Sequence, residues 1–253
     1  MNYIKADPQG NITAIVTDPS DPKDRIRIAS GIMGKDRTVE QVAFVTDPEN
    51  GSDISIEMAG GEFCGNAALS AAALFFLRKG AKKGTCMVSV SGTNRSIPVS
   101  VERTDPEKPA FIGAVSMPLP KKIAPFEFNT DLGRLTLNVV DFGGISHAVT
   151  DRTADREFAE RNIAAMCFQY GSEAFGLMLF DRETCILDPL VYVPALDSMF
   201  WEKTCASGTA AIGACFAPAD LKIKEPGGVL GISSRENYLL LENQVTLYPG
   251  PAC

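Results

Sequence analysis

The sequence predicts an α+β protein of two similar halves, each a strand-rich unit that surrounds one helix. Three observations support this prediction. Short runs of β-branched residues recur with turn residues between them, two alanine-rich segments each begin just after a cysteine, and prolines separate the two parts. The chain has 253 residues, 45% of them hydrophobic, which is enough for one large domain or two smaller ones with real cores.

The first half begins with a series of short predicted strands. β-branched and aromatic residues dominate each run, and turn sequences such as Asp7-Pro8-Gln9-Gly10 separate neighbouring runs. The predicted strands are 12–17, 41–46, 54–58, 87–90, 97–101 and 111–117.

A helix is predicted over residues 67–77, inside this series of strands. The segment is apolar on every side except at Ser70, and it closes with Arg78, Lys79 and Gly80. Cations followed by a glycine are typical of a helix C-terminus. A helix that is apolar all round is expected to be enclosed on all sides.

The boundary between the halves is predicted between residues 117 and 122, where Pro118 and Pro120 interrupt both periodicities. The N-terminal half is therefore 1–118 and the C-terminal half 119–253, with the final strand able to cross back to the first half. The predicted strands of the second half are 135–140, 147–149, 174–180, 190–193, 229–232 and 245–247.

The second half contains a related helix that follows Cys205. Alignment of Cys64 on Cys205 also pairs Asn66 with Ser207, Ala73 with Ala214 and Phe75 with Phe216. The two helices are therefore predicted to be copies of one motif. A groove between the halves, where both helix N-termini can face each other, is the expected binding site.

Charge and cysteine usage exclude several classes of protein. The formal charge of −7 with interspersed signs argues against a nucleic-acid partner, since phosphate binding needs clustered basic residues. The N-terminus has no signal-peptide pattern, and no apolar stretch approaches the ~18 residues needed to span a bilayer, so a cytoplasmic protein without a membrane partner is expected. A homodimer is compatible with the sequence because dimers are the commonest soluble assemblies.

The seven cysteines and the single histidine, His147, do not form a metal-site pattern, because no short Cys-x-x-Cys spacing occurs. We expect no metal and no disulfide scaffold. Five of the cysteines are predicted to be buried packing residues: Cys86, Cys167, Cys185, Cys215 and Cys253.

Cys64 and Cys205 are different because both occupy the same place in a repeated motif. A helix N-terminus stabilises an anion, so each thiol is expected to have a pKa lowered towards neutrality. Backbone N–H groups of Gly65, Asn66, Ala206, Ser207 and Gly208 could hold a substrate carboxylate. One cysteine could then remove a proton from Cα while the other returns one on the opposite face, which inverts a stereocentre without a cofactor.

At these residues the sequence resembles the diaminopimelate epimerase superfamily, the cofactor-independent two-cysteine racemases and epimerases. The resemblance implies an α/β (α+β) fold of two pseudo-symmetric halves, each a curled, mainly antiparallel sheet around a central helix. The stretches that carry it span most of the chain and are 10–13, 40–42, 61–66, His147, 205–209 and 226–228.

Within that superfamily the chain is more similar to the histidine racemases of staphylopine-type metallophore biosynthesis, through 40–44, 62–67, 176–181 and 201–205. Diaminopimelate epimerases carry several asparagines and a Glu-Arg pair for the distal end of their substrate, and these are missing here. The resemblance therefore implies racemisation of L-histidine to D-histidine for opine metallophore biosynthesis. Ala195 stands where the histidine racemases have a glutamate, so diaminopimelate epimerase activity or a broader specificity stays open. A non-catalytic amino acid-binding protein is a further open alternative.

The residues expected to act are assigned on the same resemblance. The catalytic residues are Cys64, Cys205 and Glu40, where Glu40 either binds the substrate ammonium or assists proton transfer. Asn66 and Thr209 are equally explained as helix-capping residues. The substrate-binding residues are Asn11, Gly65, Asn66, His147, Ala206, Ser207, Gly208 and Thr209.

Overall fold

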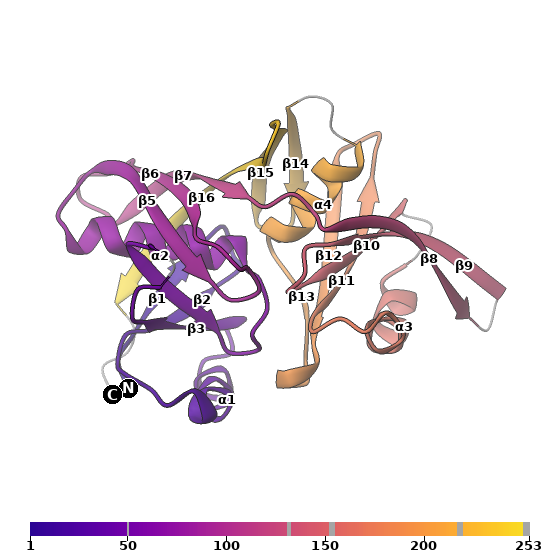
Figure 1. Cartoon of the computed structure of the whole chain (residues 1–253), viewed down its shortest axis with the longest axis horizontal. Coiled ribbons are helices and arrows are strands. Elements are labelled where there is room, and N and C mark those ends of the chain that lie inside the picture. The colour runs from indigo at the N-terminus through magenta and orange to yellow at the C-terminus, as the bar shows by residue number, and fades with distance from the viewer. Residues whose placement is uncertain (50, 131–132, 152–154, 217–219, 250–253) are drawn as a thin grey trace.

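The chain folds into a mixed α+β structure with a closed strand barrel and few helices (Figure 1). The computed structural model describes residues 1–49, 51–130, 133–151, 155–216 and 220–249. Its strands form one continuous 16-stranded sheet, which is mainly antiparallel. None of the helices in these ranges is long and apolar enough to cross a membrane. The predicted α+β class is confirmed.

The barrel closes because β1 pairs with β2 on one side and with β16 on the other, so the strand order β1 to β7 and then β16 returns to its start. Only β2–β3 and β4–β5 pair in parallel within it. Its strands are β1 (Tyr3–Asp7), β2 (Thr13–Val16), β3 (Gln41–Thr46), β4 (Ile54–Met58), β5 (Lys83–Val90), β6 (Ile97–Arg103), β7 (Ala110–Met117) and β16 (Leu239–Pro249).

Helix α2 (Gly65–Arg78) lies inside this barrel and packs against β4, β5, β6, β7, β16 and β1. Small alanines let the helix approach the surrounding strands closely, and nearly every side chain from Gly65 to Leu74 is buried. Ser70, the polar exception, donates its hydroxyl to the Asn66 carbonyl oxygen at 2.7 Å. The prediction of an apolar, enclosed helix is confirmed.

The second group of strands packs around helix α4 (Ala206–Phe216), which contacts β9, β10, β11, β15 and β16. Its strand order is β15-β14-β12-β11-β10-β9-β8, with β13 paired to residues 190–193 of β12. The strands are β8 (Lys122–Thr130), β9 (Gly133–Asp141), β10 (Ser146–Asp151), β11 (Phe175–Asp181), β12 (Ile186–Val193), β13 (Ser198–Trp201), β14 (Leu221–Glu225) and β15 (Gly228–Ser234).

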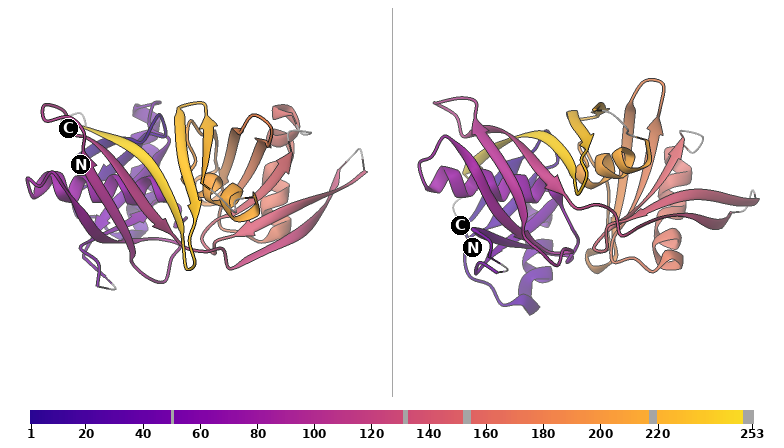
Figure 2. Two further views of the ribbon diagram at one scale, coloured as in Figure 1. Left: turned by 90° about the horizontal axis from the view of Figure 1, so that it is seen from above. Right: turned by 45° about the horizontal axis from the view of Figure 1, so that its top comes forward.

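Strand β16 joins the two groups. Its first residues, Leu239 to Glu242, pair with β15 on one side and with β7 on the other. Its last residues pair with β1, so the yellow strand in Figure 2 runs from the second group into the barrel. The register places Leu241 and Val245, both buried, towards the core around α2.

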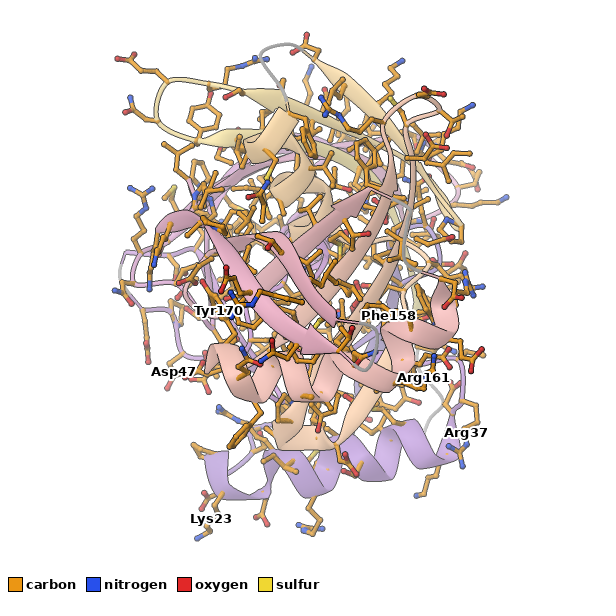
Figure 3. The ribbon with its side chains drawn as sticks, turned by 90° about the vertical axis from the view of Figure 1, so that its right-hand side faces the viewer. Lys23, Arg37, Asp47, Phe158, Arg161 and Tyr170 are labelled. Carbon is orange, nitrogen blue, oxygen red and sulfur yellow. The ribbon has the colours of Figure 1, made fainter. Side chains whose placement is uncertain are left out.

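Two helices and several strands were not among the predicted elements. Helix α1 (Arg25–Lys35) follows the 3₁₀ turn η1 (Pro22–Asp24), and helix α3 (Arg156–Tyr170) begins where Asp155 accepts the Phe158 N–H and ends at Gly171 with a φ of 79°. The missed strands are β1, β8, β13 and β14. Helix α1 packs against β3, and α3 packs against β11 and β12. Both helices lie at the surface in the end view of Figure 3, and only part of each is buried. A further 3₁₀ turn, η2 (Pro194–Leu196), precedes β13.

The buried side chains form one large core and two smaller ones. The large core contains α2 and α4 together, and both Cys64 and Cys205 belong to it. The smaller cores lie under α3 and under α1. The two cysteine-led helices therefore meet inside one continuous apolar region.

Candidate active site

Cys64 and Cys205 line the same enclosed cavity. It has a volume of about 20 Å³, which is room for roughly one water molecule. The structure therefore describes a closed site. The other lining residues are Gln41, Glu62, Phe63, Asn66, Ile145, Val191, Val193, Glu202, Ala206 and Ser207.

Each cysteine sits at the start of its helix and accepts a hydrogen bond from the first turn. Cys64 is the N-cap residue of α2, and its Sγ atom accepts the Ala67 N–H at 3.4 Å. The Sγ atom of Cys205 accepts the Gly208 N–H at 3.3 Å. The equivalent placement of the two thiols was predicted from the repeated motif, and the geometry agrees with it.

The first turns of α2 and α4 are in direct contact. A Cβ atom added at Gly65 would lie 3.0 Å from the Ala206 Cβ atom and 2.8 Å from the Met117 sulfur. Residue 65 therefore needs to be small for the helices to approach this closely. The backbone N–H groups predicted to hold a carboxylate belong to these first turns.

Asn66 is fixed by a buried amide network. Its Nδ2 group donates to the Thr204 carbonyl oxygen at 2.9 Å and to Asn11 Oδ1 at 3.2 Å. Its Oδ1 atom accepts from Asn243 at 2.8 Å. The Asn66 side chain thus ties α2 to the segment before Cys205 and to β16. Asn243 was not predicted from the sequence.

Glu40 does not line the cavity that contains the two thiols. It lies in a neighbouring depression of about 600 Å³ that also includes Lys203 and Arg37. The Asn11 side chain donates to Glu40 at 3.1 Å and connects it to Asn66. Burial raises the pKa of Glu40 to about 7, against the opposing effects of Asn11 and Lys203.

The expected lowering of the cysteine pKa values is wrong for this closed site. Burial is the main cause that raises the pKa of Cys64, and the Glu202 carboxyl adds to it. Burial, Glu202 and Glu225 likewise raise the pKa of Cys205 well above its ordinary value. The N–H groups of the first helical turns oppose these effects but do not outweigh them.

Three buried glutamates that sequence reasoning left without a role surround the thiols. Burial raises the pKa of Glu62 to about 7 and those of Glu202 and Glu225 to about 8. Glu225 accepts hydrogen bonds from the Cys205 N–H group, at 2.5 Å, and from the Thr209 hydroxyl group. The available signal was position, because Glu62 and Glu202 each stand just before a cysteine of the motif.

The remaining predicted residues differ in how closely they approach the cavity. Ser207 lines it, with its Oγ atom 3.7 Å from Cys205 Sγ, whereas Thr209 lies behind and bonds to Glu225. His147 is fully buried against Gly176 and does not line the cavity. Among the described residues neither of its ring nitrogens has a hydrogen-bond partner, and burial lowers its pKa to about 3.

The other cysteines and the metal-ligating side chains can be placed in the same way. Cys86 and Cys167 are buried as predicted, whereas Cys185 and Cys215 are only half-buried because they lie near strand and helix ends. Cys253 lies outside the described residues. In the described part of the chain, no group of three or more His, Cys, Asp or Glu side chains could hold a metal ion.

Comparisons with known proteins give consistent results. A family model described as the histidine racemase CntK N-terminal domain matches residues 1–245. A histidine racemase of Fusobacterium nucleatum subsp. nucleatum is 34% identical over 222 residues, covering 84% of this chain and 80% of the relative. A histidine racemase of Staphylococcus aureus is 27% identical over 269 residues, covering 97% of this chain and 94% of the relative.

Among solved structures, a hydroxyproline epimerase from Agrobacterium vitis with bound trans-4-hydroxy-L-proline is similar in fold, with a TM-score of 0.66. The sequence identity is 10%, and the match covers 99% of this chain and 91% of that chain. At this identity the likeness concerns the fold alone.

Proposed function

Because the chain belongs to the histidine racemase family and is an amino acid racemase, an isomerase, we propose that it interconverts L- and D-histidine without a cofactor, with Cys64 and Cys205 as acid and base. The observation that carries the proposal is that both thiols, each at the start of a buried helix, line one cavity. The curated relatives named above are histidine racemases, which supports histidine as the substrate.

The proposed reaction needs one thiolate and one thiol on opposite faces of the substrate Cα. The thiolate removes the Cα proton, the negative charge spreads onto the substrate carboxylate, and the second thiol gives its proton to the other face. First-turn N–H groups at Gly65, Asn66, Ala206, Ser207 and Gly208 would hold that carboxylate and stabilise its added charge.

The raised pKa values of the thiols describe the closed site without substrate. An amino acid brings an α-ammonium group into the cavity beside Glu62 and the two cysteines, and this cation favours the charged form of a neighbouring thiol. We propose that this cation allows one thiol to ionise. Asn11, Glu40, Thr209 and His147 then contribute to substrate binding from behind the cavity, through Asn66, Glu225 and the packing around Gly176.

The cavity lining favours histidine over diaminopimelate. Its apolar wall consists of Phe63, Ile145, Val191 and Val193, and no lysine or arginine lines it in the part of the chain that is described. A distal carboxylate would therefore lose its water without gaining a cation, at a cost of several kcal/mol. Burial of an imidazole ring carries a much smaller desolvation cost.

We also propose that residues 1–118 and 119–253 form two pseudo-symmetric halves with the site between them. We propose further that the enzyme works in the cytoplasm, where it supplies D-histidine to opine metallophore biosynthesis. The two cysteine-led helices support the halves, as does the strand break between β7, which ends at Met117, and β8, which begins at Lys122.

The test is proton exchange at Cα in heavy water. Incubation with L-histidine is expected to place deuterium at Cα, seen by proton NMR, and to produce D-histidine on a chiral column. Cys64→Ser and Cys205→Ser are each expected to lower the rate by about 10²- to 10⁴-fold.

Cys86→Ser, which changes a buried free thiol in the core but outside the cavity, is the matched control and is expected to keep the rate. Diaminopimelate and the other amino acids run in parallel define the specificity. Binding of an amino acid without any exchange would identify a non-catalytic binding protein and contradict the proposal.

A further inference from the structure

Two hydrogen bonds connect Cys64 through Gln41 to Glu202, which lines the same cavity as Cys205. The Cys64 thiol donates to Gln41 Oε1 at 3.1 Å, and Gln41 Nε2 donates to Glu202 Oε1 at 2.8 Å. The Glu202 and Cys205 side chains interact in turn. All four residues line the same cavity.

We propose that Gln41 and Glu202 form a reversible array that couples the protonation of Cys64 to that of Cys205, with Glu202 acting as a neutral carboxylic acid. The proposal rests on the two-cysteine racemase function. It assigns the two residues a positioning role, because they act on the thiols rather than on the substrate.

One form of the array has the polarity seen in the structure. Cys64 is a thiol and donates to the Gln41 carbonyl oxygen, while the Gln41 amide donates to one oxygen of Glu202. The other oxygen of Glu202 then carries the proton and donates it to the Cys205 thiolate. In this form Cys205 is the base and Cys64 is the acid.

The second form has the opposite polarity. When Cys64 is a thiolate it needs a donor, so the Gln41 amide turns over and presents its NH₂ group to the sulfur. The Gln41 carbonyl oxygen then faces Glu202, whose carboxyl group makes a half-turn so that its O–H points to Gln41, and the other carboxyl oxygen accepts from the Cys205 thiol. Thr13 Oγ1, 3.5 Å from Gln41 Oε1, can donate to the amide or accept from it and so tolerates both orientations.

The proton balance closes in both directions. Each form holds two protons on Cys64, Glu202 and Cys205 together, and Glu202 keeps one of them throughout. A turnover moves the Cα proton onto one cysteine and transfers the proton of the other cysteine to Cα. The two forms are therefore the ones that take opposite enantiomers, and the array stabilises the thiolate in each.

The surroundings of Glu202 favour its neutral form. The carboxyl groups of Glu40, Glu62 and Glu225 and the thiols of Cys64 and Cys205 all interact electrostatically with it, and burial together with Glu40 and Glu62 raises its pKa to about 8. Asn11 and Gln41 donate to Glu202 but carry no charge. An ionised Glu202 could not donate to either Cys205 or Gln41.

The test compares two substitutions of Glu202. Glutamine can donate and accept as the neutral acid does, so Glu202→Gln is expected to keep kcat/KM within about tenfold of wild type, whereas Glu202→Met is expected to lower it by about 10²-fold or more. Wild-type kcat/KM is expected to fall above pH about 8 as Glu202 ionises, and Glu202→Gln is expected to lack this fall. Equal losses in both variants would show that the carboxylate itself is required and would overturn the proposal.

A second readout needs no turnover, so it separates this inference from the proposed function. In infrared spectra, the S–H band of Cys64 is the one that is lost in Cys64→Ser. This band is expected to shift to higher frequency in Gln41→Met, because the thiol loses its hydrogen-bond acceptor. The protonated-carboxyl absorption at neutral pH is expected to lose one component, that of Glu202, in Glu202→Gln.

Ser70→Ala removes a buried hydroxyl of α2 that bonds only to its own helix, and it is expected to change neither band. An S–H band that stays unchanged in Gln41→Met, or the absence of a Glu202 carboxyl band at neutral pH, would overturn the array even if the enzyme proves to be a racemase. Absence of any Cα exchange in wild type would instead overturn the proposed function.

Discussion

One oxygen of the Glu62 carboxyl group has no hydrogen-bond partner among the described residues, although the side chain is only 4% exposed. Backbone N–H groups of Gly60 and Glu62 interact with the carboxyl group, so its position is set before a ligand arrives. A buried, unsatisfied oxygen costs about 1–3 kcal/mol, and a ligand donor placed there recovers that cost. The cavity beside it would receive the substrate, whose α-ammonium and imidazole groups are both donors.

Glu62→Gln is expected to raise the KM for histidine by about 10-fold, because the amide offers a weaker and partly mismatched partner to a cationic or N–H donor. Steady-state kinetics with histidine and with alanine separate the two donors. A loss confined to histidine identifies the imidazole, and an equal loss with both substrates identifies the α-ammonium. Unchanged kinetics with both amino acids would show that Glu62 does not contact the substrate.

At this scale the sequence predicted the residues that a motif defines. Cys64, Cys205, Asn66, Ala206 and Ser207 were predicted and all line the cavity. The glutamates around them were not assigned, because a glutamate in a sequence is most often a surface residue and only the fold shows that it is buried. The sign of the cysteine pKa shifts was missed for the same reason.

The contact between the starts of α2 and α4 determines how far apart the two thiols lie. Gly65→Ala is expected to push these helix starts apart, since the added methyl would lie 2.8 Å from the Met117 sulfur and 3.0 Å from the Ala206 Cβ atom. We expect kcat to fall by about 10- to 100-fold while the backbone N–H of residue 65 is retained. The free energy of unfolding is expected to fall by about 1–3 kcal/mol.

Gly31→Ala in α1 is the matched control, because a Cβ atom there meets nothing within 4 Å. It is expected to leave kcat unchanged and to raise the free energy of unfolding by roughly 0.5–1 kcal/mol. Racemase assays and urea titrations of both variants measure these effects. A Gly65→Ala enzyme with wild-type kcat would show that the spacing of the helices is not limiting.

Elements were predicted best where a buried face repeats with a clear period. The strands 41–46 and 54–58 were predicted with the bounds that the structure has, and the helix that follows Cys64 extends only a few residues beyond its predicted range. Helices α1 and α3 were missed because each covers a sheet from outside and has few buried residues. Strand β8 was missed because only Phe128 of its residues is buried.

Over the whole molecule, the buried acids make stability depend on pH. Folding raises the pKa of Glu40 and Glu62 to about 7 and of Glu202 and Glu225 to about 8, from their ordinary value of 4.5. Between those values the folded state binds more protons than the unfolded state, so stability falls as pH rises. His147 has the opposite sign, since its pKa falls from 6.5 to about 3, and its effect fades within about one pH unit above 6.5.

Urea unfolding is therefore expected to show a loss of about 1–3 kcal/mol between pH 6.5 and pH 8, where the effect of the carboxyl groups outweighs what remains of the His147 effect. Glu202→Gln replaces one of the acids with a neutral amide and is expected to reduce the slope. Stability that stays constant or rises over this range would contradict the picture of neutral, buried glutamates.

The sequence predicted the class of fold and the repeated helix, and it allowed the final strand to cross back to the first half, but it did not predict β1, the strand with which the barrel closes. Closure depends on pairing between β1 and β16, which lie at opposite ends of the described chain, and no local pattern encodes such a pairing. The homodimer stays a prediction, which sedimentation of the intact protein measures.

Strand β16 has a consequence for how the protein is made. The barrel around α2 needs β16 between β7 and β1, yet the ribosome produces β16 only after the whole second group of strands. Until then the nascent chain exposes two unpaired edges, on β1 and β7, beside an apolar helix. Such edges invite pairing with other chains. Chaperone capture is therefore expected to matter most late in synthesis. The active site can form only once β16, the last strand of the barrel, is in place.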